Sequence, residues 1–263
     1  MINARWSGSG PLVLAIHGLG CSLGFWDGAL ALLGPSCQAV AIDVPGFGQS
    51  PPLPAPWSVP GLASAVSAWL DEEGIDRVVV IGHSLGGMIA QELAGLEAAR
   101  GSGRIRGLVL CCTIPAASER VKEVNEALAD LTEREGSGAL ADAVMPAMLG
   151  PEPLDGTAAA AARFRRDFAA SADEALAGTL RAIGGFDARA HLSTLADQGL
   201  ASLVVAGEHE ANQADQQLLA RLLRARYVIV PGTRHLAPAE SPRRFSDAVG
   251  PFLESLASGA AWQ

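Results

Sequence analysis

The stretch RVVVIGHSLGG at residues 77–87 decides the fold of this chain. Its first half is a short run of β-branched residues, which is typical of a strand buried on both faces of a parallel sheet. Its second half contains GHSLG at residues 82–86, which fits the pattern G-x-S-x-G, and helical spacing follows over residues 85–96. The stretch therefore predicts a sharp strand–turn–helix that exposes the hydroxyl of Ser84.

Similar apolar runs surround this stretch and predict further buried strands. Their residues are 11–16 (PLVLAI), 39–44 (AVAIDV), 105–112 (IRGLVLCC), 200–206 (LASLVVA) and 226–230 (RYVIV). Helical patterns lie between or after them, at residues 62–70, 85–96 and 243–256. Strands that alternate with helices predict an α/β fold with a mostly parallel central sheet and helices on both faces.

The middle of the chain lacks the strand pattern seen before and after it. Residues 116–190 show no strand pattern, and their alanine-rich helical segments are expected at 119–133, 139–148 and 158–183. We therefore expect one core formed by residues 1–115 and 191–263, interrupted by a helical cap insertion over residues 116–190.

Composition excludes several function classes. The net charge is −9 and the pI about 5.0, which disfavours nucleic acid and an anionic membrane surface as partners. No apolar run reaches the length of a membrane span, and MINARWSGSG lacks the apolar core of a signal peptide. The four cysteines show no metal-binding or redox spacing, and a cytoplasmic protein is expected.

A serine hydroxyl is a poor nucleophile unless a base takes its proton. His235 is the candidate base, because it ends the loop PGTRH that follows the strand RYVIV. A loop in that place hangs over the carboxyl edge of the sheet, where Ser84 is expected. Of the other histidines, His17 and His191 are interpreted as structural, His83 is expected to point along the turn beside Ser84, and His209 is a weaker alternative base.

The acid that orients the base is expected between Ser84 and His235 in chain order. Glu210 is the favoured candidate, because it lies just past the glycine that ends the strand LVVA. Glu208 and Asp215 remain alternatives.

Acyl transfer also needs donors for the negative charge that develops on the carbonyl oxygen. The backbone N–H of Leu85, directly after Ser84, and that of Leu19, in the loop HGLG at residues 17–20, are the candidates.

Five stretches together resemble the α/β-hydrolase superfamily, in its branch of small bacterial esterases and lactonases. They are HGLG at residue 17, DVPGFGQS at 43–50, GHSLGG at 82–87, LVVAGEHE ending at 210, and GTRH ending at 235. The resemblance implies an eight-stranded, mostly parallel sheet with a helical cap. It also implies a catalytic triad of Ser84, His235 and Glu210, with a structural role for Asp43.

Two departures from that family are visible. Only ten residues precede PLVLAI, so the first edge strand is expected to be missing, leaving one short strand near residues 2–6. The acid position holds Glu210, where the family more often has aspartate.

The expected function is a serine hydrolase that cleaves a small-to-medium carboxylic ester through an acyl-enzyme, with no metal and no organic cofactor. A lactonase, a thioesterase, a carbon–carbon bond hydrolase and a cofactor-free perhydrolase are alternatives on the same triad, and a non-catalytic binding protein is less favoured. Haloalkane dehalogenases and epoxide hydrolases resemble this fold but carry aspartate in place of Ser84. Candidate pocket residues for the small acyl substrate are Phe25, Trp26, Met145, Met148, Phe164 and Phe168.

Overall fold

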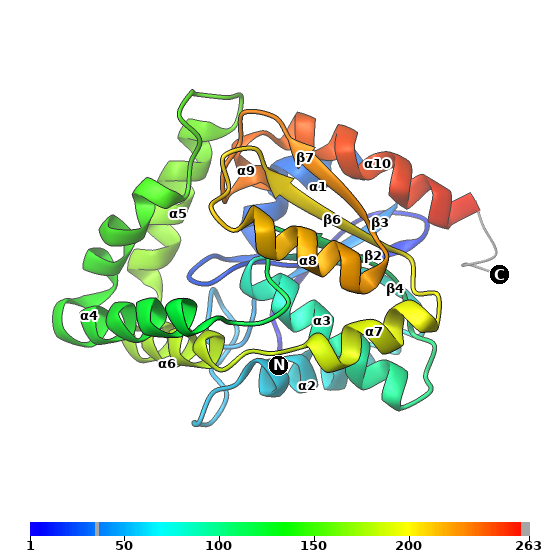
Figure 1. Ribbon diagram of the computed structural model, residues 1–263, viewed down its shortest axis with the longest axis horizontal. Coiled ribbons are helices and arrows are strands. Elements are labelled where there is room, and N and C mark those ends of the chain that lie inside the picture. Colours follow the sequence, from blue (N-terminus) through cyan, green and yellow to red (C-terminus); the bar gives the residue numbers. More distant parts are fainter. Residues whose placement is uncertain (35–36, 259–263) are drawn as a thin grey trace.

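A seven-stranded sheet forms the centre of the computed structural model, which describes residues 1–34 and 37–258 (Figure 1). The spatial order is β1-β3-β2-β4-β5-β6-β7, and every neighbouring pair is parallel except β1 with β3. The strands are β1 Ala4–Gly8, β2 Leu12–Ile16, β3 Gln38–Ile42, β4 Val78–His83, β5 Ile105–Cys111, β6 Ser202–Gly207 and β7 Arg226–Val230. The predicted strands and the mostly parallel sheet are therefore confirmed.

Strand β1 forms one edge of the sheet. It pairs antiparallel with β3 from Ala4 opposite Ile42 to Gly8 opposite Gln38, and most of its residues are exposed. The described residues thus contain seven strands, as the short N-terminal segment predicts, and not the eight that the family resemblance implies.

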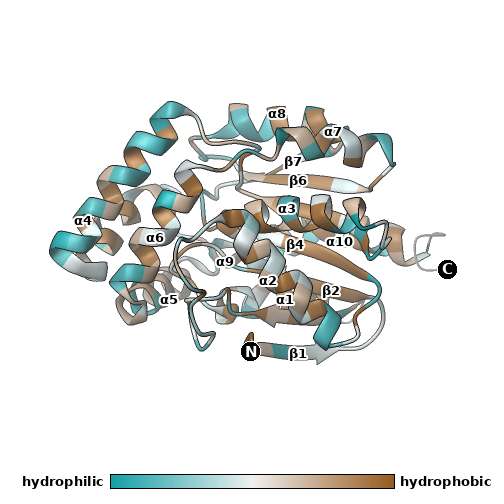
Figure 2. Cartoon of the chain, turned by 90° about the horizontal axis from the view of Figure 1, so that it is seen from below, coloured by the Kyte–Doolittle hydropathy of each residue, from teal (hydrophilic) through white to brown (hydrophobic). Residues whose placement is uncertain are grey.

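Helices cover both faces of the sheet. Helix α1 packs against α10 on one face, while α2, α3, α7 and α8 pack in sequence on the other (Figure 1). Their bounds are α1 Asp27–Leu33, α2 Val59–Glu72, α3 Leu85–Ala99, α7 Arg189–Asp197, α8 Gln213–Leu223 and α10 Pro242–Ser258, with η1 Leu23–Trp26 and α9 Ala237–Glu240 as short turns. Between these layers β4 is buried along its whole length, and the hydrophobic colouring follows the strands (Figure 2).

The remaining helices lie together beyond one edge of the core in both views (Figures 1 and 2). They are α4 Glu119–Val144, η2 Met145–Ala147, α5 Thr157–Ala170 and α6 Asp173–Gly184. Helix α4 packs along α6, and Arg181 of α6 forms ion pairs with three acidic side chains of α4. An isolated bridge between Ala116 and Asp187 brings the two ends of this segment together.

The helices of the middle region agree with the sequence at one break and differ at another. The helices expected at 119–133 and 139–148 are separated, as predicted, at Gly136, whose φ of 85° interrupts α4; the second part ends at Val144, and η2 follows. The single helix expected over 158–183 is two helices, because Ser171 is extended with a ψ of 142°. Helix α7 begins at Arg189, next to residue 190, where the sequence predicts the end of the cap.

Asp43 holds the loops at the carboxyl edge of the sheet. This buried carboxylate accepts hydrogen bonds from the Asn3 side chain (2.7 Å), the Leu23 N–H (2.6 Å) and the Gln49 N–H (2.8 Å). Nearby, the Nε2 atom of His17 accepts the N–H of Val44 at 2.9 Å. Both side chains therefore hold neighbouring backbone segments in place, which agrees with the structural roles expected for Asp43 and His17.

Asp43→Ala should lower the free energy of unfolding by about 3 kcal/mol, because it leaves buried donors without an acceptor. Urea denaturation followed by circular dichroism measures the change. Asp76→Ala is the matched control, since Asp76 is exposed and should change the same quantity by less than about 0.5 kcal/mol. Equal effects in the two variants would contradict the role given to Asp43.

Candidate active site

Ser84 stands on the turn between β4 and α3, with φ 51° and ψ −116°. A non-glycine residue adopts this left-handed region only where its surroundings hold it there. The Ser84 N–H donates to the Cys111 carbonyl at 2.9 Å, and the Thr113 hydroxyl donates to the Ser84 carbonyl at 2.8 Å. A Cβ at Gly82 would meet the Gly86 backbone, so only glycine allows the turn to be this tight.

Ser84, His235 and Glu210 form one hydrogen-bonded row. The Ser84 Oγ lies 3.0 Å from the His235 Nε2, and the His235 Nδ1 lies 2.9 Å from the Glu210 Oε2. His235 comes from the loop after β7 and Glu210 from the loop after β6, so both reach the carboxyl edge of the sheet where β4 ends. The structure thus brings together three side chains that sequence reasoning selected from distant segments.

The rival acids lie elsewhere. Glu208 is exposed and its Oε2 accepts the Gly232 N–H at 2.7 Å, which closes the loop before His235. Asp215 lies in the first turn of α8. Of the other histidines, His209 is exposed, and His191 forms an ion pair with Glu92 at 3.3 Å.

The contact between His235 and Glu210 shifts the pKa values of the two side chains in opposite directions. Burial alone would lower the pKa of His235, but the charge and hydrogen bond of Glu210 outweigh it and raise that pKa. Burial works against the Glu210 carboxylate, yet the charge and hydrogen bond of His235 hold the pKa of Glu210 below its ordinary value. The protonated form of His235 is therefore stabilised at the place where a proton from Ser84 would arrive.

His83 makes a contact that the sequence did not predict. Its Nε2 lies 2.7 Å from the carbonyl oxygen of His235, so this nitrogen carries the proton and donates. Its ring stacks on Phe25 with centroids 4.5 Å apart. Burial, together with the nearby charge of His235, lowers the pKa of His83 well below the usual value, so the ring is neutral. The residue before Ser84 thus ties the turn to the loop that carries His235.

The loop after β2 packs directly against this turn. A Cβ at Gly18 would lie 2.8 Å from the His83 Nδ1 and 3.3 Å from the Ser84 Cβ, so only glycine fits. Leu19 follows in the same loop and lines the cavity above Ser84, while Leu85 begins α3 and is buried. Leu19 and Leu85, whose amides are expected to bind an oxyanion, therefore both lie next to Ser84.

A cavity of about 190 Å³ opens above Ser84. Its walls are mostly apolar and come from the loop after β2, the turn at Ser84 and the helices α4, α5 and α6. Three of the predicted pocket residues, Met148, Phe164 and Phe168, lie in this wall.

The other three predicted pocket residues lie outside the lining of that cavity. Trp26 is fully buried and packs against Phe25 and against Phe245 of α10, because η1 turns it towards the core. Phe25 lies behind His83 and borders a separate small cavity. Met145 begins η2 and packs on the core beside the cavity, whereas Met148, three residues later, faces into it.

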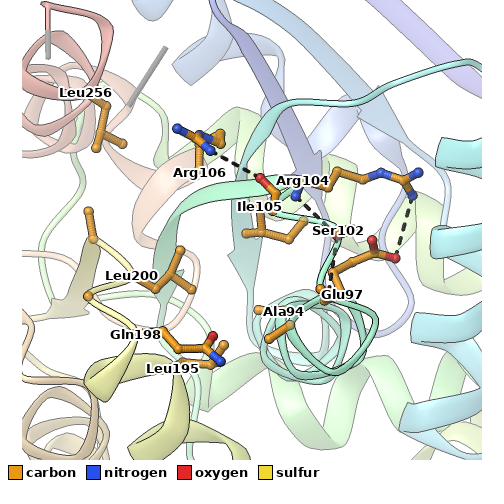
Figure 3. Close-up of a pocket in the computed structure, with 15 residues that line it drawn as sticks. Ala94, Glu97, Ser102, Arg104, Ile105, Arg106, Leu195, Gln198, Leu200 and Leu256 are labelled. Carbon is orange, nitrogen blue, oxygen red and sulfur yellow. Dashed lines mark hydrogen bonds and ion pairs between the residues drawn. The ribbon is translucent and has the colours of Figure 1, made fainter. Parts of the chain in front are cut away.

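A larger cavity of about 520 Å³ lies at the opposite end of the strands (Figure 3). It is bordered by Ile105 at the start of β5 and by Glu97 near the end of α3, whereas the cavity at Ser84 adjoins the other end of both elements. The buried Glu97 carboxylate pairs there with Arg100 and Arg104, which gives it a structural role.

Within the described ranges, no three or more histidine, cysteine, aspartate or glutamate side chains gather in an arrangement that would hold a metal ion. Across the same residues, no helix combines the length and apolar character needed to cross a membrane.

Known proteins with similar sequences include hydrolases. Lipase LipV of Mycobacterium tuberculosis is 35% identical over 154 residues, which cover 55% of this chain and 57% of that protein. The matched part spans between 24% and 57% of the length of the curated relatives.

Two solved structures share the fold over nearly the whole chain. The enol-lactonase from Burkholderia xenovorans LB400 has a TM-score of 0.82 at 26% identity, covering 97% of this chain and 94% of that one. A thermophilic esterase from Thermogutta terrifontis has a TM-score of 0.86 at 23% identity, covering 98% and 94%. The predicted α/β-hydrolase fold is therefore confirmed.

The family comparison extends over the same region. The model described as "Alpha/beta hydrolase family" matches residues 12–248, which include every strand from β2 to β7 and the whole Ser84–His235–Glu210 row. The chain therefore belongs to the alpha/beta hydrolase family.

Proposed function

We propose that the protein is a serine hydrolase that cleaves a small-to-medium carboxylic ester through an acyl-enzyme. The observation that carries this proposal is the row from Ser84 through His235 to Glu210, which opens into a mostly apolar cavity. A nucleophile, a base within hydrogen-bond reach and a group that orients the base are the arrangement that acyl transfer requires.

In the proposed reaction, His235 takes the proton of Ser84 as the Oγ attacks the ester carbonyl carbon. The backbone N–H groups of Leu19 and Leu85 stabilise the negative charge on the carbonyl oxygen. The tetrahedral intermediate collapses, and the alcohol leaves with the proton from His235. Water then attacks the carbonyl carbon of the acyl-enzyme while His235 takes its proton. The second tetrahedral intermediate collapses by breaking the bond to Ser84, His235 returns the proton to the Oγ, and the carboxylic acid is released.

Glu210 has two roles in this cycle. Its hydrogen bond to Nδ1 leaves the Nε2 lone pair directed at the Ser84 hydroxyl, at the observed distance of 3.0 Å. Its charge stabilises the imidazolium that forms when His235 takes the proton, which agrees with the raised pKa of His235.

The cavity limits the substrate. The volume of about 190 Å³ is many times the roughly 10–15 Å³ that one water molecule needs on the same measure, so an acyl group of several heavy atoms fits. The apolar walls favour an alkyl chain over a charged one. We propose that the segment 116–190 acts as a cap that selects this chain, because α4, α5 and α6 supply much of the wall.

A lactonase is the second candidate function. The similarity to an enol-lactonase at 26% identity over 97% of this chain favours it. A lactone is a cyclic ester, so the same groups would act on it, and the alcohol would remain joined to the acid product.

Ser84→Ala should lower hydrolysis of p-nitrophenyl esters by at least about a thousandfold, because the nucleophile is lost. The assay compares acetate to octanoate esters with the wild type and the variant in parallel, and circular dichroism checks that both are folded. Substantial turnover by a folded Ser84→Ala protein would refute the acyl-enzyme.

Glu210→Gln should lower kcat by roughly 10²–10⁴-fold and move the acid limb of the pH profile to lower pH. In the wild type, kcat/KM should fall as the pH drops through an apparent pKa above about 6.5, because Glu210 raises the pKa of His235. Without that charge, burial lowers the pKa. Glu208→Gln and Asp215→Asn are controls that should leave the profile unchanged; a larger loss in either would reassign the acid.

Met148→Ala should shift the preferred ester towards longer acyl chains, because it removes a side chain from the cavity wall. Met145→Ala is the matched control, since Met145 is similarly half-buried but does not line the cavity. The ratio of kcat/KM for octanoate to that for butyrate should rise about tenfold in the first variant alone. An equal shift in both variants would remove Met148 from the acyl site.

A further inference from the structure

Glu240 carries a buried carboxylate that the proposed reaction does not use. It ends the short helix α9, which follows the loop of His235, and it is 0% exposed. Its Oε1 accepts the backbone N–H of Gly150 at 2.6 Å, and its Oε2 accepts that of Arg234 at 2.8 Å. Burying a carboxylate is costly unless hydrogen bonds satisfy its oxygens, and here each oxygen has its own donor. The side chain is therefore held between two segments of backbone.

The two donors belong to segments with different tasks in the proposed reaction. Arg234 directly precedes His235 in the loop after β7. Gly150 follows η2 and lies close in sequence to Met148, whose side chain lines the cavity above Ser84. The two oxygens of one carboxylate thus connect the loop of the base to a segment that supplies part of the cavity wall.

These two segments lie against each other beside the cavity. The Leu236 N–H donates to the Met148 carbonyl at 3.0 Å, and both residues line the cavity. A Cβ at Gly150 would lie 2.2 Å from the Gly232 carbonyl oxygen, so only glycine permits this close approach of backbone. A displacement of either segment is therefore passed to the other through direct contact.

A second hydrogen bond joins the same segments without the Glu240 carboxylate. The Ser241 hydroxyl donates to the Asp155 carboxylate at 2.7 Å. This bond touches neither Arg234 nor Gly150. It offers a matched comparison, because it ties the two segments together but does not reach the residue before His235.

The bridge at Glu240 requires both oxygens of a carboxylate. An ionised carboxylate accepts hydrogen bonds with either oxygen, whereas the side-chain amide of glutamine has one accepting oxygen and one donating NH₂ group. In Glu240→Gln the NH₂ group must face one of the two backbone N–H groups, so one of the two bonds is lost. The substitution keeps the shape of the side chain and breaks the bridge.

We propose that Glu240 is a positioning residue, whose carboxylate couples the loop of His235 to the cavity wall at Met148. This inference rests on the proposed function, since it assigns a role at the same site. The backbone around His235 is then fixed at two points, by Glu240 at the Arg234 N–H and by His83 at the His235 carbonyl. One side chain sets both the place of the base and the depth of the acyl site.

Glu240→Gln should lower kcat for p-nitrophenyl butyrate about tenfold, because the loop of His235 loses part of its support. It should also raise the ratio of kcat/KM for octanoate to that for butyrate about threefold, because the wall at Met148 yields to a longer chain. A misplaced base affects both esters and cancels in this ratio. The ratio therefore reports on the wall, and kcat for butyrate reports on the base.

The double variant Glu240→Gln with Met148→Ala tests the link to the wall. Once the Met148 side chain is absent, Glu240→Gln should leave the octanoate-to-butyrate ratio where Met148→Ala sets it. The kcat for butyrate should still fall about tenfold. A rise in the ratio equal to that in the wild-type background would overturn the coupling of Glu240 to Met148.

Two further variants separate positioning from stability, with circular dichroism at the assay temperature as the check of folding. Ser241→Ala removes the bond to Asp155 and should keep the wild-type kcat and ratio. Gly150→Ala keeps Glu240 but forces the two segments apart, so it should lower kcat for butyrate, and it carries the test if Glu240→Gln does not fold. Equal losses of kcat in Ser241→Ala and Glu240→Gln, or a wild-type kcat in folded Gly150→Ala, would overturn the proposal.

Amide hydrogen exchange followed by NMR tests the coupling without turnover. The N–H of Leu236 binds the Met148 carbonyl and not Glu240, so its exchange reports on the contact between the segments. Glu240→Gln should speed this exchange, and Ser241→Ala should not. If the wild type hydrolyses no ester, the proposed function fails while the exchange rate still tests the bridge. An unchanged rate at Leu236 in folded Glu240→Gln would overturn it.

Discussion

The left-handed backbone of Ser84 is the constraint on which the rest of the structure depends. It lets β4 turn into α3 within one residue, so the hydroxyl stands clear of the sheet. Neighbouring groups hold Ser84 in this conformation. The Cys111 carbonyl accepts the Ser84 N–H, and the Thr113 hydroxyl donates to the Ser84 carbonyl. The glycines of the turn leave room for neighbouring backbone. Strain stored at one residue thus requires close packing of β2, β5 and the loop at Gly18 around it.

Much of this architecture follows from local patterns in the sequence. Each buried parallel strand is a continuous apolar run, so the strands from β2 to β7 could be located to within a few residues. The row of side chains could also be anticipated, because Ser84, Glu210 and His235 each follow a predicted strand, and parallel strands end at one edge. The sequence does not predict the helix break at Ser171, because the alanine-rich residues around it favour helix throughout.

Contacts between distant segments were harder to anticipate. The hydrogen bond from His83 to the His235 carbonyl joins residues 152 positions apart, and nothing in either segment points to the other. The sequence identifies Cys112 only as a small apolar residue, and its positive φ becomes visible only in the structure. The cavity wall shows the same limit: Trp26 and Met148 are both large and apolar, and only the packing of η1 and η2 decides which of them faces the core.

The position of β7 at the free edge of the sheet has a consequence for how activity is lost. Edge strands open before central ones, and the outer residues of β7 are only partly buried. The loop after β7 carries His235, while Ser84 follows β4 at the centre. A brief fraying of this edge would separate His235 from Ser84 while the rest of the sheet stays intact. Under the proposed function, the rate of hydrolysis is then a more sensitive measure of local order than any spectroscopic signal averaged over the whole molecule.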